Sequence, residues 1–135
     1  MFIRNKNVGD VMLDLGRFPV VTEDIILKEA LEKMDKFRLG VACIVSSNNQ
    51  LLGIITDGDI RRKLLTMQKP LVAFFIDDAI NQSIKTPVIV TSSMGLIDAI
   101  EIMENQQVWD LPVVDNGELV GLLHLHSATK ALLLG

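Results

Sequence analysis

The feature that most constrains the fold of this chain is an internal repeat. From Thr22 and Thr91 onwards the two halves align at an offset of 69 residues, so that similar apolar side chains recur at matching positions. The matched pairs are Leu27 with Leu96, Ala30 with Ala99, Leu31 with Ile100 and Met34 with Met103. A one-residue gap then changes the offset to 68 and pairs Gly53 with Gly121. Self-similarity of this kind indicates a duplicated supersecondary unit, here of roughly 60 residues.

The repeat divides the chain into two motifs. The starts of the two copies align as Val8 to Met12 with Ile76 to Ile80, and as Pro19 to Thr22 with Pro87 to Thr91. The predicted division is a first motif at residues 8–68, a linker at 69–75 and a second motif at 76–134. The linker contains Phe74 and Phe75, which we interpret as an apolar anchor against the rest of the chain.

Each copy is predicted to contain a strand, a helix, two strands and a second helix. Apolar side chains at helical spacing predict the helices, and short β-branched runs bounded by turn residues predict the strands. Asn116 and Gly117 form a favoured hairpin turn. In the first copy the elements are expected at residues 19–22, 24–38, 42–45, 51–56 and 59–67, and in the second at 87–91, 93–106, 111–114, 118–123 and 127–134.

The predicted fold class is α/β (α+β). One copy is too small to bury a thick core, so the two β-α-β-β-α repeats are expected to pack through their sheets with pseudo-two-fold symmetry. This packing would form two related clefts between the copies. A cleft between repeats is a natural place for a small ligand.

Composition excludes several functional classes. The net charge is −4, the basic residues are scattered and there is no Tyr, which argues against a nucleic-acid surface. No apolar run approaches the roughly 18 residues of a membrane span, and residues 1–6 lack the apolar stretch of a signal peptide. Cys43, the single cysteine, lies in an apolar run and is expected to be buried in a reducing compartment. We therefore expect a cytoplasmic protein.

The motifs of metal sites and phosphate-cleaving enzymes are missing from the sequence. His124 and His126 would share one face if their strand continued, but two histidines with a distant cysteine do not complete a zinc site. Residues 57–59 lack the further acidic ligands of a calcium loop, and there is no phosphate-binding glycine loop. We assign no metal, no tightly bound cofactor and no catalytic residue.

The most polar junction of the chain lies at residues 53–62. An apolar strand ends at Thr56, and a helix is predicted to begin near Asp59. Free N–H groups at a helix start favour an anion, and two arginines in the first turns would oppose the helix dipole unless an anion were present. The alternative is that Asp57 and Asp59 cap the helix and balance the arginines. These ten residues alone do not decide between the two.

The duplicated unit, with Gly-hydrophobic-hydrophobic-Thr-x-x-Asp at residues 53–59, resembles the cystathionine-beta-synthase (CBS) domain pair from about Val8 to Leu134. Thr-Asp-Gly-Asp-Ile-Arg-Arg at 56–62 and Gly-Leu-Leu-His-Leu-His at 121–126 are similar to the C-terminal region of the arabinose-5-phosphate isomerase family. In that family a sugar-isomerase (SIS) domain carries the catalysis and precedes the CBS pair. Because 135 residues leave no room for it, the resemblance implies a fragment or a stand-alone relative that does not isomerise a sugar by itself.

The resemblance implies an adenosine-nucleotide site in a first cleft. Thr56 would hydrogen-bond a phosphate, Lys85 would pair with it, and Asp59 would accept from both ribose hydroxyls because a carboxylate has two acceptor oxygens. Trp109 either contacts the base, where stacking would contribute about 1–3 kcal/mol, or packs against a partner subunit. The residues implied for this cleft are Thr56, Asp59, Arg61, Lys85, Val88, Val108 and Trp109.

The second cleft departs from the family pattern. His124 stands in place of the Thr, as is common among the isomerases, and Ser127 stands in place of the acidic residue. A single hydroxyl holds a diol less firmly than a carboxylate, so we expect the two clefts to be unequal. The residues implied for the second cleft are His124, Ser127, Val20, Leu39 and Val41.

Two functions follow from these expectations. The first is a regulatory module that binds AMP, ADP, ATP or a CMP-linked sugar and controls sugar-phosphate isomerisation in lipopolysaccharide or capsule sugar synthesis. The second is a module that forms a homodimer through its helices and binds no nucleotide. A free-standing enzyme is a third and weaker alternative. Besides a small nucleotide, the implied partners are a second copy of the chain and an SIS isomerase domain, with no nucleic acid and no membrane.

Overall fold

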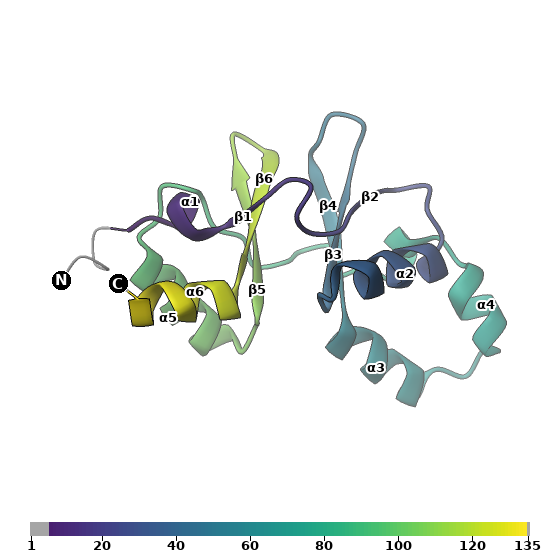
Figure 1. Ribbon diagram of the computed structural model, residues 1–135. Helices are drawn as coiled ribbons and strands as arrows, with labels where there is room; N and C mark the ends of the chain where they lie inside the picture. The colour runs from purple at the N-terminus through teal and green to yellow at the C-terminus, as the bar shows by residue number, and fades with distance from the viewer. Residues whose placement is uncertain (1–5, 135) are drawn as a thin grey trace. The chain divides into compact units, whose positions relative to one another are not determined.

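The computed structural model describes residues 6–134 and contains two compact units (Figure 1). The middle unit is the continuous segment Gly16–Pro87, and the split unit combines the chain up to Leu15 with the chain from Val88 onwards. Most of the segment inspected for a signal peptide lies outside the described residues. Among the described residues, no helix is both long and apolar enough to span a bilayer.

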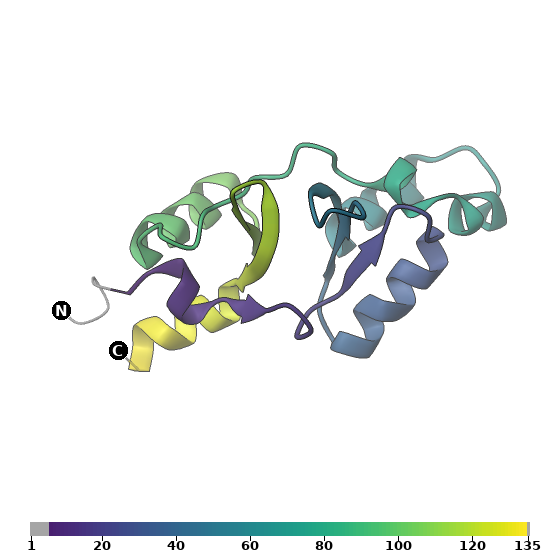
Figure 2. The same ribbon diagram turned by 90° about the horizontal axis from the view of Figure 1, so that it is seen from above.

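The middle unit contains a three-stranded sheet with helices beside it. The sheet has the order β2-β3-β4, in which β3 pairs parallel with β2 and antiparallel with β4. Figure 2 shows α2 running along this sheet. The elements are β2 (Val20–Thr22), α2 (Leu27–Phe37), β3 (Val41–Val45), β4 (Leu51–Thr56), α3 (Asp57–Thr66), α4 (Leu71–Ile76) and the 3-10 helix η2 (Ala79–Gln82).

The core of the middle unit follows the apolar pattern of its sequence. Leu27, Ala30 and Met34 recur at helical spacing on α2 and are all buried. They pack with residues of β3 and with Phe74, which α4 contributes from the segment predicted to be a linker. The apolar residues of that segment therefore form a short helix that closes the core.

The split unit contains an antiparallel sheet of order β1-β6-β5, and α5 and α6 lie side by side against it (Figure 1). Its core repeats that of the middle unit, with Leu96, Ala99 and Met103 of α5 in place of the buried residues of α2. The elements are α1 (Val8–Val11), β1 (Leu13–Asp14), α5 (Leu96–Gln106), β5 (Asp110–Asp115), β6 (Glu118–His124) and α6 (Leu125–Leu134).

The duplication is visible in fine details of the backbone. Both hairpins have a register shift at the same place, between Ile44 and Val45 in one and between Val113 and Val114 in the other. Both helices α2 and α5 also end in a left-handed residue, Arg38 with φ 57° and Gln107 with φ 54°. These matches have the offset of 69 residues that the sequence indicated.

One predicted strand does not form. Residues 87–91 make only an isolated parallel bridge, between Val90 and Val113, instead of a strand equivalent to β2. In the middle unit the N–H of Cys43 donates to Pro19 O at 3.0 Å. The residue equivalent to Cys43 in β5 is Pro112, which has no N–H to donate. The prediction of a second full strand was therefore wrong because one proline removes a hydrogen bond of the ladder.

The alignment of the two starting segments also needs correction. The N–H of Leu27 at the start of α2 donates to Asp77 O at 2.8 Å, and the N–H of Leu96 at the start of α5 donates to Lys6 O at 2.9 Å. Asp77 is thus equivalent to Lys6, which shifts the predicted pairing of Val8 with Ile76 by three residues. Helix α4 occupies the extra residues. The starting segment of each sequence copy also lies in the compact unit that holds the sheet of the other copy.

Two glycines allow these starting segments to approach the sheets. A methyl group added to Gly53 of β4 would lie 2.5 Å from Ser83 Oγ and 3.0 Å from Ile84 O. A methyl group added to Gly121 of β6 would lie 2.9 Å from Leu13 O. The recurrence of glycine at this position is therefore explained by the close approach of a backbone rather than by a turn.

We expect Gly121→Ala and Gly53→Ala each to lower the free energy of unfolding by about 1–3 kcal/mol, because backbone atoms would have to move to admit the methyl group. Urea titration followed by circular dichroism measures this change. Gly58→Ala is the matched control, since its methyl group would meet only the ends of arginine side chains and a helical alanine is favoured over glycine. Equal stability of all three variants would contradict this account.

The carboxylate of Asp77 holds η2 in place. Its oxygens accept hydrogen bonds from Asn81 Nδ2 at 3.0 Å, Gln82 Nε2 at 2.8 Å and the N–H of Asp78 at 2.9 Å. The bonds from Asn81, Gln82 and Asp78 lower the pKa of Asp77 below its ordinary value. A lowered pKa in the folded state adds stability above the pKa of the unfolded chain, and this stability is lost as the pH falls through the folded pKa.

We expect Asp77→Asn to lower the melting temperature at pH 7, where the wild-type carboxylate is ionised. The difference from wild type should shrink as the pH falls below about 4, the ordinary range for this side chain, because the wild-type group then becomes neutral as well. Melting curves across this pH range measure the effect. The neighbouring Asp78→Asn is the control, because the Asp78 side chain does not cap η2. A difference that does not depend on pH would contradict the prediction.

Candidate ligand site at the strand-to-helix junctions

Thr56 closes β4 and caps α3. Helix α3 begins at Asp57, two residues earlier than predicted, and the hydroxyl of Thr56 accepts a hydrogen bond from the N–H of Asp59 at 3.2 Å. Of the two alternatives left open above, capping of the helix by Asp57 and Asp59 is not what the structure shows, since the cap is Thr56. A hydroxyl that accepts this bond still carries a proton, which it can donate to an oxygen of a ligand.

The side chain of Asp59 in the middle unit is partly buried. It is 19% exposed, but Oδ2 is fully buried and receives no hydrogen bond within the described part of the chain. Lys63 Nζ lies 3.5 Å from Oδ2, close enough for an ion pair, while it donates a hydrogen bond to Gln82 O at 2.7 Å. A buried acceptor without a hydrogen bond costs roughly 1–3 kcal/mol. The exposed part of the side chain consists of its other atoms.

Two arginines gather at the same end of α3. A methyl group added to Gly58 would lie 3.3 Å from Arg62 Nη1 and 3.8 Å from Arg61 Nη2, so both guanidinium groups lie beside the first turn of the helix. Both side chains are exposed. Cations at this end oppose the helix dipole by a few tenths of a kcal/mol. The junction thus gathers the hydroxyl of Thr56, the carboxylate of Asp59 and two guanidinium groups at the start of α3.

The equivalent junction of the split unit has the same backbone and different side chains. The N–H of Asp57 donates to Gly40 O at 3.0 Å, and the N–H of Leu125 donates to Trp109 O at 2.8 Å. His124 therefore takes the position of Thr56, and Ser127 takes that of Asp59. Helix α6, like α3, starts two residues earlier than predicted.

The imidazole of His124 is paired with a carboxylate that was not predicted from the sequence. Its Nδ1 lies 2.6 Å from Oδ1 of Asp110, which stands opposite His124 in the pairing of β5 with β6. An ionised carboxylate accepts, so Nδ1 carries the proton in this arrangement. The pair fixes the imidazole. Within residues 6–134 no three His, Cys, Asp or Glu side chains are grouped so that they could hold a metal ion.

The predicted site residues are distributed over both units. In the middle unit Val41 of β3 pairs with Thr56 of β4. Val20 of β2 pairs with Cys43, which lies two residues after Val41 on β3. In the split unit Trp109 is 70% exposed. The middle unit holds Thr56, Asp59, Arg61, Lys85, Val20, Leu39 and Val41, and the split unit holds Val88, Val108, Trp109, His124 and Ser127.

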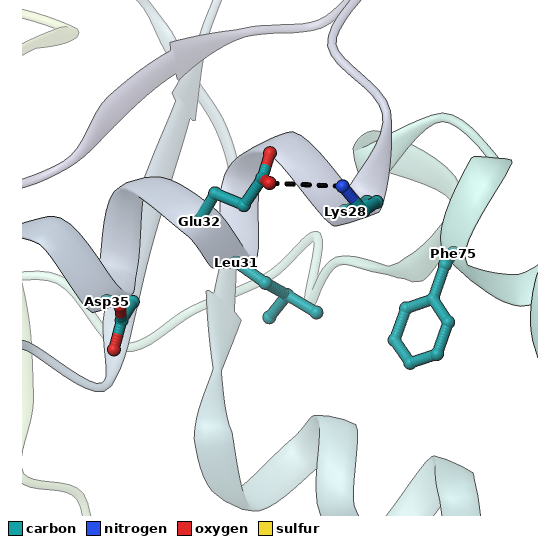
Figure 3. Close-up of a pocket in the computed structure, with 5 residues that line it drawn as sticks. All are labelled: Lys28, Leu31, Glu32, Asp35 and Phe75. Atoms are coloured by element: carbon teal, nitrogen blue, oxygen red, sulfur yellow. Dashed lines mark hydrogen bonds and ion pairs between the residues drawn. The ribbon is translucent and has the colours of Figure 1, made fainter.

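Two pockets lie on the individual units. One of about 360 Å³ lies between α2 and α4, where Leu31 and Phe75 point into a common space below the ion pair of Lys28 with Glu32 (Figure 3). It contains none of the predicted site residues. A second pocket of about 290 Å³ lies between α1 and α6 of the split unit and includes Ser127 in its lining.

Lys63 and Asp110 are the polar partners that sequence reasoning overlooked. The spacing of Lys63 four residues after Asp59 is a signal for a helical ion pair and could have revealed it. The partnership of Asp110 with His124 depends on hairpin register, which the turn at Asn116 fixes only when the position of the bulge is known. Nothing in the sequence singles out Gln82.

Comparison with known proteins adds a family and several relatives. The CBS domain matches residues 8–66 and again residues 67–134. An uncharacterized protein of Chlamydia muridarum is 31% identical over 96% of this chain and 40% of its own length. The arabinose 5-phosphate isomerase KdsD of Yersinia pestis is 30% identical over 92% of this chain and 37% of its own length. The chain therefore spans well under half the length of these curated relatives.

Solved structures of similar fold cover almost the whole chain. CBSX2 in complex with AMP is 25% identical, with a TM-score of 0.84 over 96% of this chain and 98% of the other. CBSX2 is a CBS-pair protein of Arabidopsis thaliana. The CBS domain pair of MJ0100, in complex with 5-methylthioadenosine and S-adenosyl-L-methionine, is 18% identical, with a TM-score of 0.78 over 94% of this chain and 95% of the other. The second likeness concerns the fold alone.

Thr56→Val removes the cap hydroxyl and keeps the shape of the side chain. We expect it to lower the free energy of unfolding by about 1 kcal/mol, because the N–H of Asp59 loses its acceptor. Thr56→Ser, which keeps the hydroxyl, should retain most of the stability. Urea unfolding of the three proteins measures the difference. A valine variant as stable as wild type would show that the cap does not contribute.

Proposed function

The chain belongs to the CBS domain family, and from that premise we propose that it is a regulatory module that binds an adenosine nucleotide or a nucleotide-linked sugar. The observation that carries the proposal is the first junction. There a capping hydroxyl, a half-buried carboxylate and two arginines meet within the first turns of α3. These groups suit a ligand that has both a phosphate and a vicinal diol. The complex of CBSX2 with AMP supports this ligand class.

Each part of the nucleotide has a proposed contact. Thr56 donates its remaining proton to a phosphate oxygen, with Arg61 and Lys85 as the cationic partners. Asp59 accepts from the ribose. For the adenine we propose Trp109, Val88 and Val108, and stacking on the indole would contribute about 1–3 kcal/mol.

The second junction is proposed to bind the same ligands more weakly or not at all. His124 already has Asp110 as a partner, and Ser127 offers one hydroxyl where Asp59 offers a carboxylate. The apolar residues proposed for this cleft are Val20, Leu39 and Val41. The two sites would thus differ in affinity although their backbones correspond.

The host activity is proposed from the relatives. KdsD of Yersinia pestis is similar over most of this chain, so we propose a module that controls the activity or assembly of a sugar-phosphate isomerase-like protein. Catalysis would belong to an SIS domain and not to the residues described above. The setting would be cytoplasmic synthesis of lipopolysaccharide or capsule sugars.

A second candidate function is an interaction module that binds no nucleotide. Helices α3 and α6 expose large apolar side chains at their carboxyl-terminal ends, which favours association through these helices. The exposed residues are Leu64 and Leu65 on α3, and Leu133 and Leu134 on α6. A homodimer formed through them is compatible with either function.

We expect AMP, ADP, ATP or a CMP-linked sugar to raise the melting temperature of the chain. A ligand at a hundredfold excess over its Kd adds about 2.7 kcal/mol to stability. Asp59→Ala should abolish the shift without preventing folding, whereas Asp35→Ala, on the exposed surface of α2, should leave it unchanged. Differential scanning fluorimetry and calorimetry measure both.

Other outcomes would select the other candidates. If none of these ligands stabilises the chain at millimolar concentration and light scattering shows a stable dimer, the interaction module is favoured. If Asp59→Ala binds as tightly as wild type, the site assignment is wrong. Turnover of arabinose 5-phosphate by this chain alone would overturn the proposal of a non-catalytic module.

A further inference from the structure

The ammonium group of Lys63 contacts both the carboxylate of Asp59, which is proposed to bind the ligand, and a backbone carbonyl of η2. Its Nζ donates to Gln82 O at 2.7 Å and lies 3.5 Å from Oδ2 of Asp59. The Lys63 side chain is 32% exposed, so water does not fully screen these contacts. All three residues lie in the middle unit.

This arrangement keeps one acceptor of Asp59 away from solvent. Oδ2 is buried and faces Lys63, so Oδ1 is the only oxygen of this carboxylate that a ligand could reach without a rearrangement. A single hydroxyl can bind to one oxygen. A vicinal diol that uses both oxygens requires the carboxylate to turn until Oδ2 leaves the interior.

We propose that Lys63 is a positioning residue that holds Asp59 in the orientation with one exposed oxygen and thereby opposes the binding of a vicinal diol. When a diol binds both oxygens, Oδ2 turns towards the ligand and its ion pair with Lys63 is lost. Lys63 then keeps only its hydrogen bond to the carbonyl of Gln82. The inference rests on the proposed function, because it takes Asp59 as the residue that binds the ribose. It adds that Lys63 sets how strongly the site distinguishes a diol from a single hydroxyl.

The hydrogen bonds beyond Lys63 connect the orientation of Asp59 to the rest of the middle unit. Gln82 is buried, and its Nε2 donates to Asp77 Oδ2 at 2.8 Å. Asp77 O in turn accepts from the N–H of Leu27 at the start of α2. A change in the bond between Lys63 and Gln82 therefore acts on a segment that is tied to both α2 and β4. A ligand that binds the two states of Asp59 differently shifts their populations accordingly.

The decisive test compares adenosine with 2′-deoxyadenosine, which lacks the diol and, like adenosine, lacks phosphate. We expect Lys63→Met to bind adenosine about two- to fivefold more tightly than wild type, the range of one partly screened ion pair. Its affinity for 2′-deoxyadenosine should not change. Isothermal titration calorimetry measures both constants. Lys28→Met is the matched control, since it removes an exposed ion pair of the same spacing, with Glu32, and should alter neither.

Two results would overturn the proposal. The first is an equal change for both nucleosides, which would indicate a general effect on folding or charge. The second is an unchanged or weaker affinity of Lys63→Met for adenosine. Lys63→Gln serves as the second variant, because its amide can still donate to Gln82 O while the ion pair is lost. It should show the same preference for the diol even if the methionine variant folds poorly.

A measurement without ligand separates this proposal from the proposed function. Asp59→Asn should release Lys63 towards Gln82 O and shift the amide nitrogen resonance of Ser83, which shares the Gln82 peptide group. The same substitution in a Lys63→Met background should leave that resonance in place. If wild type binds neither nucleoside and none of AMP, ADP, ATP and the CMP-linked sugars, the proposed function fails while this experiment still decides whether Lys63 couples Asp59 to η2. If Asp59→Asn leaves the Ser83 resonance unchanged in both the wild-type and the Lys63→Met background, Lys63 does not couple Asp59 to η2.

Discussion

The structure depends on one main-chain hydrogen bond, which is made twice. It ties the first N–H of a closing helix to the carbonyl just before the central hairpin, from Asp57 to Gly40 and from Leu125 to Trp109. Because both atoms belong to the backbone, the bond does not depend on the side chains at either junction. The path of the chain is therefore preserved while the exposed groups are free to differ. One fold consequently presents a hydroxyl and a carboxylate at one junction, and an imidazole and a hydroxyl at the other.

That freedom explains why the fold could be predicted further than the site. Helical spacing, β-branched runs and the turn at Asn116 predicted the four long helices, β2 and both hairpins, because local propensity and the core agree there. The short elements α1, β1, α4 and η2 were not predicted. The strand at residues 87–91 failed because its partner has Pro112 where a donor is needed. The starting segments were misaligned by three residues because α4 sits between the copies, and weak similarity over five residues could not locate that insertion.

The polar residues of the two junctions also fall into those that the sequence could reveal and those that it could not. Thr56 and Asp59 follow from a motif, and the duplication located their counterparts His124 and Ser127. Lys63 could have been found from its spacing. The partner of His124 could not, because it depends on a bulge in the hairpin, and Gln82 enters through a backbone carbonyl that carries no sequence signature. Sequence therefore located the side chains at the two junctions better than the groups that hold these side chains in place.

The positioning groups decide what each junction can do. At the second junction Asp110 holds His124 at 2.6 Å, a short contact that fixes the imidazole and leaves no carboxylate for a diol. At the first, the carboxylate is held more loosely, 3.5 Å from a lysine that has its hydrogen bond elsewhere. A tightly satisfied pair gains little by rearranging, whereas a buried oxygen without a hydrogen bond gains from any arrangement that supplies a donor. Local hydrogen bonding is thus incomplete at the first junction, which is why we propose this junction, and not the second, as the one that responds to a ligand.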